Sequence, residues 1–393
     1  MKYDFLSISN RKGSSAKWKS MLAYNKNLPD NIIPFSTADM EFKCLPEVVD
    51  AIKEYVENTI LGYSYMNDDF IGSFVGWMKR RHNYVVSPSS IVSTMGVVVS
   101  IFTAIRSFTK KGDGVVIMPP VYQPFYFAVN RTERCLLECD LLKKDDIYTI
   151  DFDRLERIFK EGDAKALIFC SPHNPVGRVW KREELERLSA LLIKYDIFVI
   201  SDEIHHDIIM PMKQHIVLET IDERLKDRIV TATSLSKTFN LAGLSLSTAI
   251  IPNTKNMECF KKELEKIPHN IHNGLSYKAC EVAYNKGETW LSEAIATISN
   301  NLTFANDYIS SNLPSLKTYY PDGTYLMWID FSKLHMEDDK LDVFLKDKAQ
   351  LFLTPGYVFG KESGKGFGRM NMAAPKTLIE MALRRLKNAI DSL

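Results

Sequence analysis

The sequence lacks the features that mark secreted and membrane-spanning proteins. Its six cysteines include no CxxC pair and are too few for a disulfide scaffold in 393 residues, so we expect reduced thiols and a cytoplasmic location. The N-terminus, MKYDFLSISNRKGSS, has no apolar core of a signal peptide. No later run approaches the roughly 18 apolar residues of a membrane span. We therefore expect neither secretion nor membrane insertion.

An excess of charge of one sign is also missing. The 50 Lys and Arg residues and the 49 Asp and Glu residues leave a net charge of +1. Nucleic-acid binding usually requires a basic excess, so we expect no polyanionic partner. With 45% apolar and 25% charged residues, the composition is typical of a globular protein, and the length predicts one large domain plus a smaller one.

The sequence does contain a regular alternation of apolar runs and helical patterns between about residues 90 and 250. The clearest apolar runs are GVVIM, KALIFC, IFVIS and RIVTAT, and segments such as REELERLSALLIKY separate them. This rhythm predicts an α/β fold with a mostly parallel sheet covered by helices. Ligands gather outside the carboxyl ends of such strands, so the residues after each run are the first candidates for chemistry.

A different pattern begins near residue 254. It comprises longer helical stretches, the run GTYLMWIDF, a helix near 340–349, a Gly-rich turn, the strand RMNMA and a closing helix from Pro375. This predicts a smaller α+β layer. The predicted division is an N-terminal segment 1–45 that packs with the small domain, a large domain 46–287 and a C-terminal small domain 288–393.

Three different chemical groups follow three of the apolar runs: Asn174, Asp202 and Lys237. A buried carboxylate can hold a ring nitrogen protonated, an amide can bind a phenolate oxygen, and a lysine partly removed from water can form a Schiff base. On its position alone, Lys237 is better explained as a surface lysine at a turn. The ordered set, however, suits a pyridine aldehyde. Tyr122 is placed to stack on its ring, and the turn 96–98 is expected to open a helix whose N–H groups bind a phosphate.

The motifs SPHNPVGRVW, SDEIH, SLSKTFNLAGL and GRMN occur in this order along nearly the whole chain. In these motifs the chain resembles the fold-type I pyridoxal-phosphate enzymes of the class I/II aminotransferase superfamily. The segments STADMEFKCLPEVVDAI, GYSY, PPVYQPF, DEIHHD and DGTYLMWIDF resemble its MalY/PatB-like branch of cystathionine β-lyases, which are carbon–sulfur lyases. The resemblance implies a seven-stranded, mostly parallel sheet, a pyridoxal 5'-phosphate cofactor, and a homodimer in which two chains build each site.

The same resemblance implies a role for individual residues. Lys237 is implied as the Schiff-base lysine and general base, Asp202 as the partner of the pyridine nitrogen and Asn174 as the ligand of the ring oxygen. Arg369 is implied to clamp the substrate carboxylate, which a planar guanidinium suits. The other implied contacts are Tyr122, His205, Ser234, Ser236, Val97 and Val98 to the cofactor, Tyr63 to the phosphate of the neighbouring subunit, and Ala38 to the substrate. Outside this set, Arg369 would be an ordinary surface arginine and Tyr63 a packing residue.

Departures from the superfamily pattern bear on the reaction. Many aminotransferases have a tyrosine and an arginine where this chain has His205 and Ser245, and both departures match the lyase branch. Lyase relatives usually carry a tryptophan at the place of Ser36, a change that would enlarge the pocket beside the substrate carboxylate, and often CPR where this chain has APK at 374–376. The resemblance therefore favours β-elimination on L-cystathionine or a related cysteine S-conjugate. An aminotransferase on the same scaffold, or a regulatory protein-binding role, remains the alternative.

Two other patterns are weaker candidates for sites. His205 and His206 with Asp207, and His269 with His272, contain histidines close in sequence. Adjacent histidines after a strand point in opposite directions, and no third ligand stands at zinc spacing, so we expect no metal site. The segment GKESGKGFG lacks the spacing of a phosphate loop and is expected to be a mobile turn.

Overall fold

The largest sheet of the computed structural model contains seven strands, and the structure describes residues 1–144, 146–267 and 273–393. In chain order the strands are β1 (Ile91–Thr94), β2 (Gly114–Ile117), β3 (Cys135–Glu138), β6 (Ala164–Cys170), β7 (Phe198–Asp202), β8 (Ile229–Thr233) and β9 (Ser247–Ile250). Their spatial order is β1-β9-β8-β7-β6-β2-β3. Strands β3, β2, β6, β7 and β8 pair in parallel, and β9 is antiparallel to both of its neighbours. The predicted mostly parallel sheet is confirmed.

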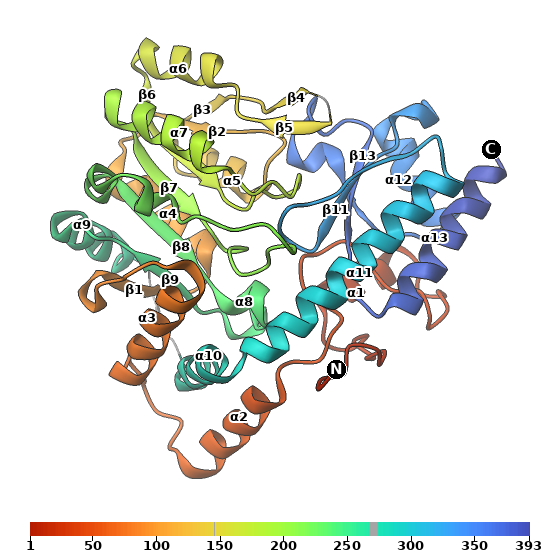
Figure 1. Cartoon of the computed structure of the whole chain (residues 1–393), viewed down its shortest axis with the longest axis horizontal. Coiled ribbons are helices and arrows are strands. Elements are labelled where there is room, and N and C mark those ends of the chain that lie inside the picture. Colours follow the sequence, from red (N-terminus) through yellow and green to blue (C-terminus); the bar gives the residue numbers. More distant parts are fainter. Residues whose placement is uncertain (145, 268–272) are drawn as a thin grey trace.

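Helices cover both faces of this sheet (Figure 1). They are α4 (Val97–Phe108), α5 (Pro124–Arg131) and α9 (Thr254–Leu264) on one face, and α6 (Phe152–Glu161) and α7 (Arg182–Lys194) on the other. The alternation of side chains along a strand explains the two layers. In β6, Ile168 packs with the first group and Leu167 and Phe169 with the second. Apolar residues on both faces thus bury the central strands, whereas the edge strand β3 stays partly exposed.

A second sheet of four antiparallel strands follows in the sequence. It consists of β10 (Lys317–Tyr319), β11 (Leu326–Asp330), β12 (Thr354–Pro355) and β13 (Phe367–Asn371), with α12 (Asp338–Asp347) and α13 (Lys376–Asp391) in the same part of the chain. The N-terminal segment lies against this layer, because Phe35 N–H donates to the Phe352 carbonyl at 2.9 Å. The contact agrees with the predicted packing of residues 1–45. The domain boundaries themselves stay a prediction.

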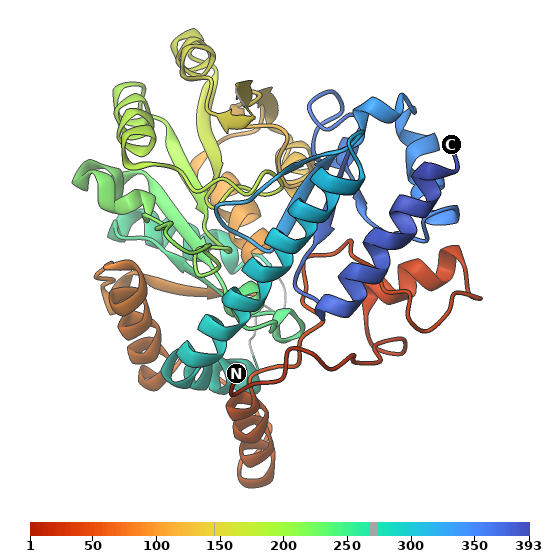
Figure 2. The same ribbon diagram turned by 45° about the vertical axis from the view of Figure 1, so that its right-hand side comes forward.

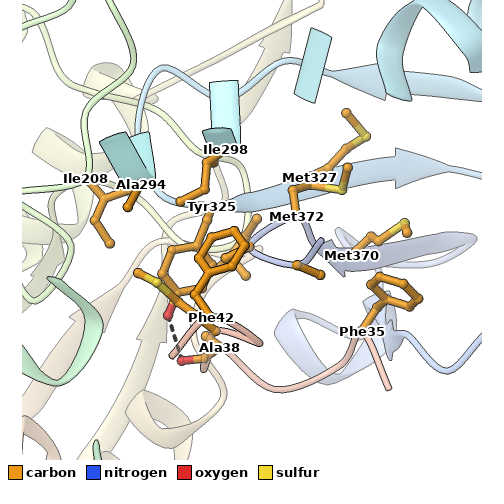
Figure 3. Close-up of a cluster of buried hydrophobic side chains, with 14 of the residues drawn as sticks. Phe35, Ala38, Phe42, Ile208, Ala294, Ile298, Tyr325, Met327, Met370 and Met372 are labelled. Atoms are coloured by element: carbon orange, nitrogen blue, oxygen red, sulfur yellow. Dashed lines mark hydrogen bonds between the residues drawn. The ribbon is translucent and has the colours of Figure 1, made fainter. Parts of the chain in front are cut away.

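The long helix α11 (Glu288–Asn312) runs between the two sheets (Figures 1 and 2). The remaining helices are α1 (Ala16–Tyr24), α2 (Pro46–Asn58), α3 (Asp68–His82), α8 (Leu235–Thr238) and α10 (Gly274–Lys286). In both views α2 extends away from the body of the molecule. One shared core joins α11, the N-terminal segment and the second sheet, through Phe35, Ile298, Met327 and Met370 (Figure 3).

Local signals fix the helix ends that matter for the site. The Asn67 side chain accepts from the Phe70 N–H at the start of α3, and Asn83 ends it in the left-handed region at φ 49°. Gly96, at φ 97°, allows the turn from β1 into α4. Strands β1, β3 and β9 and the hairpin of β4 (Leu142–Lys144) with β5 (Ile147–Thr149) lie outside the four clearest predicted runs. Among the described residues no helix is long and apolar enough to cross a bilayer.

Candidate active site

A cavity of about 500 Å³ opens at the carboxyl ends of the central strands. Tyr122 follows β2, Asn174 follows β6, Asp202 ends β7 and Lys237 follows β8, and all four line the cavity. The predicted gathering of reactive residues at one sheet edge is therefore what the fold produces. Arg369 joins them from β13 of the second sheet.

Lys237 sits in α8, the single helical turn after β8. Ser234 caps this turn, since its Oγ accepts from the Ser236 N–H at 3.1 Å. The Lys237 Nζ donates to the Ala38 carbonyl at 2.7 Å. Burial, with the nearby charge of Arg369, lowers the pKa of Lys237 to about 8. A fraction of this amine is thus unprotonated near neutral pH, as a nucleophile or general base requires.

Asp202 is a buried carboxyl group, and no cation of the described residues lies at bonding distance from it. Its Oδ1 accepts from the Ile204 N–H at 3.1 Å. Burial raises the pKa of Asp202 to about 7, although that backbone hydrogen bond acts against the rise. A cation placed beside this side chain would restore the ordinary ionised form. The site is therefore suited to a protonated ring nitrogen.

Arg369 is held in a fixed orientation by both sheets. Its Nη1 donates to the Asn174 Oδ1 at 2.8 Å, and its Nη2 donates to the Ser36 carbonyl at 2.9 Å. The guanidinium lies 4.8 Å from the centre of the Phe359 ring. Its Nε is buried and has no hydrogen-bond partner among the described residues. A carboxylate ligand could satisfy such a donor. Ser36 contacts Arg369 through its backbone carbonyl and not through its side chain, so the effect of a serine in place of tryptophan stays a prediction.

The start of α4 forms the far end of the cavity. Gly96, Val97 and Val98 line it together with Ser234 and Ser236. The first N–H groups of a helix have no partner within the helix and favour an anion, and two hydroxyl groups stand nearby. Ser245 also lines the cavity, with φ 51°. This end is suited to a phosphate.

His205 and Ala38 approach the cavity from different elements. Burial, and then the charge of Lys237, lowers the pKa of His205 well below its ordinary value, so its ring is neutral. The Tyr325 hydroxyl donates to the Ala38 carbonyl at 2.8 Å, the same oxygen that Lys237 contacts (Figure 3). Burial raises the pKa of Tyr122, so its phenol stays protonated. The structure thus brings every predicted pocket residue of one chain together.

Tyr63 is the exception, because it lies outside the cavity and its side chain is on the protein surface. The residue is 95% exposed, in the loop between α2 and α3. Sequence reasoning also missed several residues that line the cavity: Thr37, Met95, Gln123, Thr354, Val358 and Phe359. Gln123 stood within the recognised segment PPVYQPF. Thr37 stood within the recognised segment STADMEF, and Met95 directly precedes the turn 96–98. Thr354, Val358 and Phe359 come from the second layer, and only its folding onto the first reveals them.

The predicted opposite orientation of the adjacent histidines holds in the structure. His205 lines the cavity, whereas His206 contacts Thr233 and Asp207 on the other side. The expectation that no metal site forms here was drawn from ligand spacing in the sequence and stays a prediction, but the fold brings His82 from α3 and His215 from the following loop to His206. His269 and His272 lie outside the described residues. The segment GKESGKGFG forms the turn before β13, and Gly366 in it has φ 75°.

The residues of the cavity fit the cofactor that the sequence resemblance implies. Asp202 offers a carboxylate to a ring nitrogen, and Lys237 offers an aldehyde a primary amine of lowered pKa. The N–H groups at the start of α4 are placed to bind a phosphate. Asn174 already accepts from Arg369, and its amide nitrogen is left as a donor for a ring oxygen. The buried, unpartnered Nε of Arg369 lies in the same cavity, ready for a carboxylate.

Comparisons with known proteins agree with this chemistry. Residues 30–386 match the family described as aminotransferase class I and II. The chain is 37% identical to the cystathionine β-lyase PatB of Bacillus subtilis, over 91% of this chain and 92% of that one. It is 30% identical to the protein MalY of Escherichia coli over the full length of both. The crystal structure of cystalysin from Treponema denticola, which contains a pyridoxal 5'-phosphate cofactor, superposes with a TM-score of 0.98 at 43% identity over all of both chains.

Proposed function

The chain belongs to the aminotransferase class I and II family, and from that premise we propose that it is a pyridoxal 5'-phosphate-dependent carbon–sulfur β-lyase. Its substrate is L-cystathionine or a related cysteine S-conjugate, and its products are a thiol, pyruvate and ammonia. Two relatives that are at least 30% identical and span more than nine-tenths of this chain are named cystathionine β-lyase. The observation in this chain that carries the proposal is the set of Lys237, Asp202, Asn174 and Arg369 around one cavity.

When bound, the cofactor acts as an electron sink for the pair released at the substrate Cα. Lys237 takes the α-proton, for which its pKa of about 8 is close to the working pH. Asp202 holds the proton on the ring nitrogen, and because the carboxylate is buried its charge acts in a medium of low dielectric constant. Arg369 fixes the substrate carboxylate, and Asn174 holds Arg369 in place. The thiolate then leaves from Cβ.

Incubation with L-cystathionine as the sole substrate tests the reaction type. A β-lyase releases pyruvate and thiol over many turnovers without a keto-acid acceptor. An aminotransferase stops after one half-reaction, with the amino group retained on the cofactor, and this outcome would contradict the proposal. The alternative of a purely protein-binding role predicts no turnover with any β-thio amino acid. Rates of pyruvate release across a panel of β-thio amino acids would show which thiol leaving groups the enzyme prefers.

A homodimer is also part of the proposal. The loop between α2 and α3 exposes Ile60, Leu61, Tyr63 and Tyr65, each at least 65% accessible. Such a contiguous apolar surface favours a protein partner. We place this loop, and Tyr63 with it, against the cofactor phosphate of a second copy. The six cysteines are free thiols, which supports a reducing location such as the cytoplasm.

Hybrid dimers test this placement of Tyr63. Lys237→Ala removes the reactive amine, and Tyr63→Ala is expected to weaken cofactor retention. If Tyr63 acts across the interface, a hybrid of the two variants has one site with both defects and one site with neither. Mixing the two variants after reversible unfolding should therefore restore activity. If Tyr63 served its own chain, every hybrid site would carry a defect and no activity would return.

A further inference from the structure

A second cluster of buried ionisable side chains lies outside the cavity described above. His82 ends α3, His206 and Asp207 lie in the turn after β7, and His215 and Glu203 stand close by. Their side chains are at most 4% exposed. Three imidazole rings and two carboxylates from three separate segments thus converge in the interior. Imidazole and carboxylate are the nitrogen and oxygen ligands that Zn²⁺ binds in proteins.

The spacing of the donor atoms suits a single metal ion. The His82 Nε2 is 2.9 Å from one oxygen of Asp207, and the His206 Nε2 is 3.2 Å from the other. Bonds of about 2.0 to 2.1 Å in a tetrahedral zinc site separate neighbouring ligand atoms by about 3.3 Å. The donor atoms of His82, His206 and Asp207 all lie within 4.8 Å of one another. A small movement of these side chains would therefore accommodate the ion.

The surroundings of these three residues resemble the outer layer of a metal site. Asp207 also accepts from the Trp77 Nε1 at 3.0 Å and from the Thr238 Oγ1 at 2.8 Å, contacts that orient the carboxylate. The His215 ring centre lies 5.8 Å from that of His82 and 6.0 Å from that of His206. Its Nε2 pairs with Glu203 at 2.7 Å, whereas its Nδ1 is buried without a partner among the described residues.

The charges of the cluster are also compatible with a divalent cation. The Arg81 Nε lies 4.0 Å from the Asp207 Oδ1, and a divalent ion would add the further positive charge that two buried carboxylates favour. The side chains of His82 and Asp207 are 4% and 0% exposed, so an ion held between them would be shielded from water.

We propose that His82, His206 and Asp207 bind one divalent transition-metal ion of the Zn²⁺ class, with the His215–Glu203 pair beside it. The ion would tie the end of α3 to the turn after β7. Through Thr238, which contacts Asp207, it would also brace the helical turn that carries Lys237. The role is structural, since the ion lies outside the cavity where the substrate reacts. This inference does not rest on the proposed reaction.

Metal retention tests the site directly. The cofactor-loaded protein, freed of any histidine tag, is incubated with one equivalent of Zn²⁺ and dialysed, and its zinc is measured by mass spectrometry. We expect the ion to be retained. His206→Asn and His82→Asn should each weaken zinc binding by at least about 100-fold. His335→Asn, a change at an exposed histidine that already has φ 53°, should leave binding unchanged.

Two measurements keep the proposal falsifiable if a variant fails to fold. Co²⁺ added to the wild-type protein should give visible ligand-field bands, and diffraction at the zinc absorption edge should show an anomalous peak between His82 and His206. Loss of all zinc on dialysis, the absence of cobalt bands, or a peak at another place would overturn the proposal. Zinc binding that survives both His206→Asn and His82→Asn would overturn it as well.

Discussion

Asp202 and Asp207 are five residues apart, both buried, yet their environments differ in kind. Asp202 accepts one hydrogen bond from a backbone N–H, and burial raises its pKa to about 7. Asp207 accepts from Trp77, Thr238 and His82 and lies 3.2 Å from His206, and its pKa is held well below the ordinary value. The first carboxyl group faces the cavity and has no side-chain partner among the described residues, whereas several side chains of the protein hold the second in place.

The contrast extends to the residues around each aspartate. In the cavity, the Nε of Arg369 and the Nδ1 of His205 are buried without a partner among the described residues. Buried polar groups of this kind cost stability in the free chain, and a ligand that pairs with them recovers it. Around Asp207 the hydrogen bonds link α3, β8 and α8 directly. Substitutions in the cavity should therefore change activity most, and substitutions around Asp207 should change stability most.

The largest effect is expected at Lys237. Lys237→Ala removes both the amine that engages the cofactor and the base for the α-proton, so turnover should fall by more than about 10⁴-fold. The visible absorbance of the lysine-bound cofactor should disappear with it. Lys255→Ala, at an exposed lysine, is the control. Activity that survives in Lys237→Ala would refute the role given to this residue.

Asp202→Asn should come next. Loss of the charge that holds the ring nitrogen protonated should lower kcat/KM by about 10³-fold. The same substitution should also change the pH dependence of stability in the cofactor-free chain. Because Asp202 has a pKa of about 7 when folded and 3.8 as its ordinary value, the folded state binds the extra proton between these values.

Because the folded state binds this extra proton, a rise in pH should lower the free energy of unfolding. Wild-type stability should fall as pH rises from about 4 to about 7, by an upper bound of roughly 4 kcal/mol. Asp202→Asn should remove this contribution, while that of Glu219, whose pKa burial also raises to about 7, should remain. Urea unfolding of the cofactor-free protein at a series of pH values measures both slopes. Equal slopes in the two proteins would show that Asp202 is not the buried proton acceptor described here.

Asp207→Asn should show the opposite balance. The amide cannot accept all the hydrogen bonds that the carboxylate receives, so the free energy of unfolding should drop by about 3 kcal/mol. The folded fraction should keep its cofactor absorbance. Asp153→Asn, at an exposed carboxylate, should be neutral. If Asp207→Asn left the urea midpoint unchanged, the contrast between the two aspartates would fail.

Arg369→Lys should give the smallest of these effects. Lysine keeps the charge but loses the planar pair of donors, so the substrate carboxylate should be held less well. We expect kcat/KM to fall by about 10²-fold, mostly through KM, with stability close to wild type. Arg182→Lys, at an exposed position, is the control. A drop confined to kcat would instead indicate a role in the chemical step.

Part of this architecture was readable in the sequence. The runs at β2, β6, β7 and β8 contain few polar residues because parallel strands are buried on both faces, and that pattern needs no tertiary information. Ends of parallel strands meet at one sheet edge, so the order of Asn174, Asp202 and Lys237 predicted their meeting. The role of Arg369 came from resemblance, since nothing in its own segment indicates that β13 faces the strand ends of another sheet.

What the sequence determined by itself is therefore the periodic framework and the chemical identity of the groups along it. Only the tertiary structure decided which of those groups have partners. The motif DEIHHD begins with Asp202 and ends with Asp207, and nothing in it distinguishes the two aspartates. The distinction arises because α3 brings Trp77 and His82, which are 130 and 125 residues away in the sequence, to Asp207. No side chain of the described residues supplies a cation at bonding distance from Asp202. Long-range contacts set the dielectric surroundings of a carboxylate, and these are invisible in local sequence patterns.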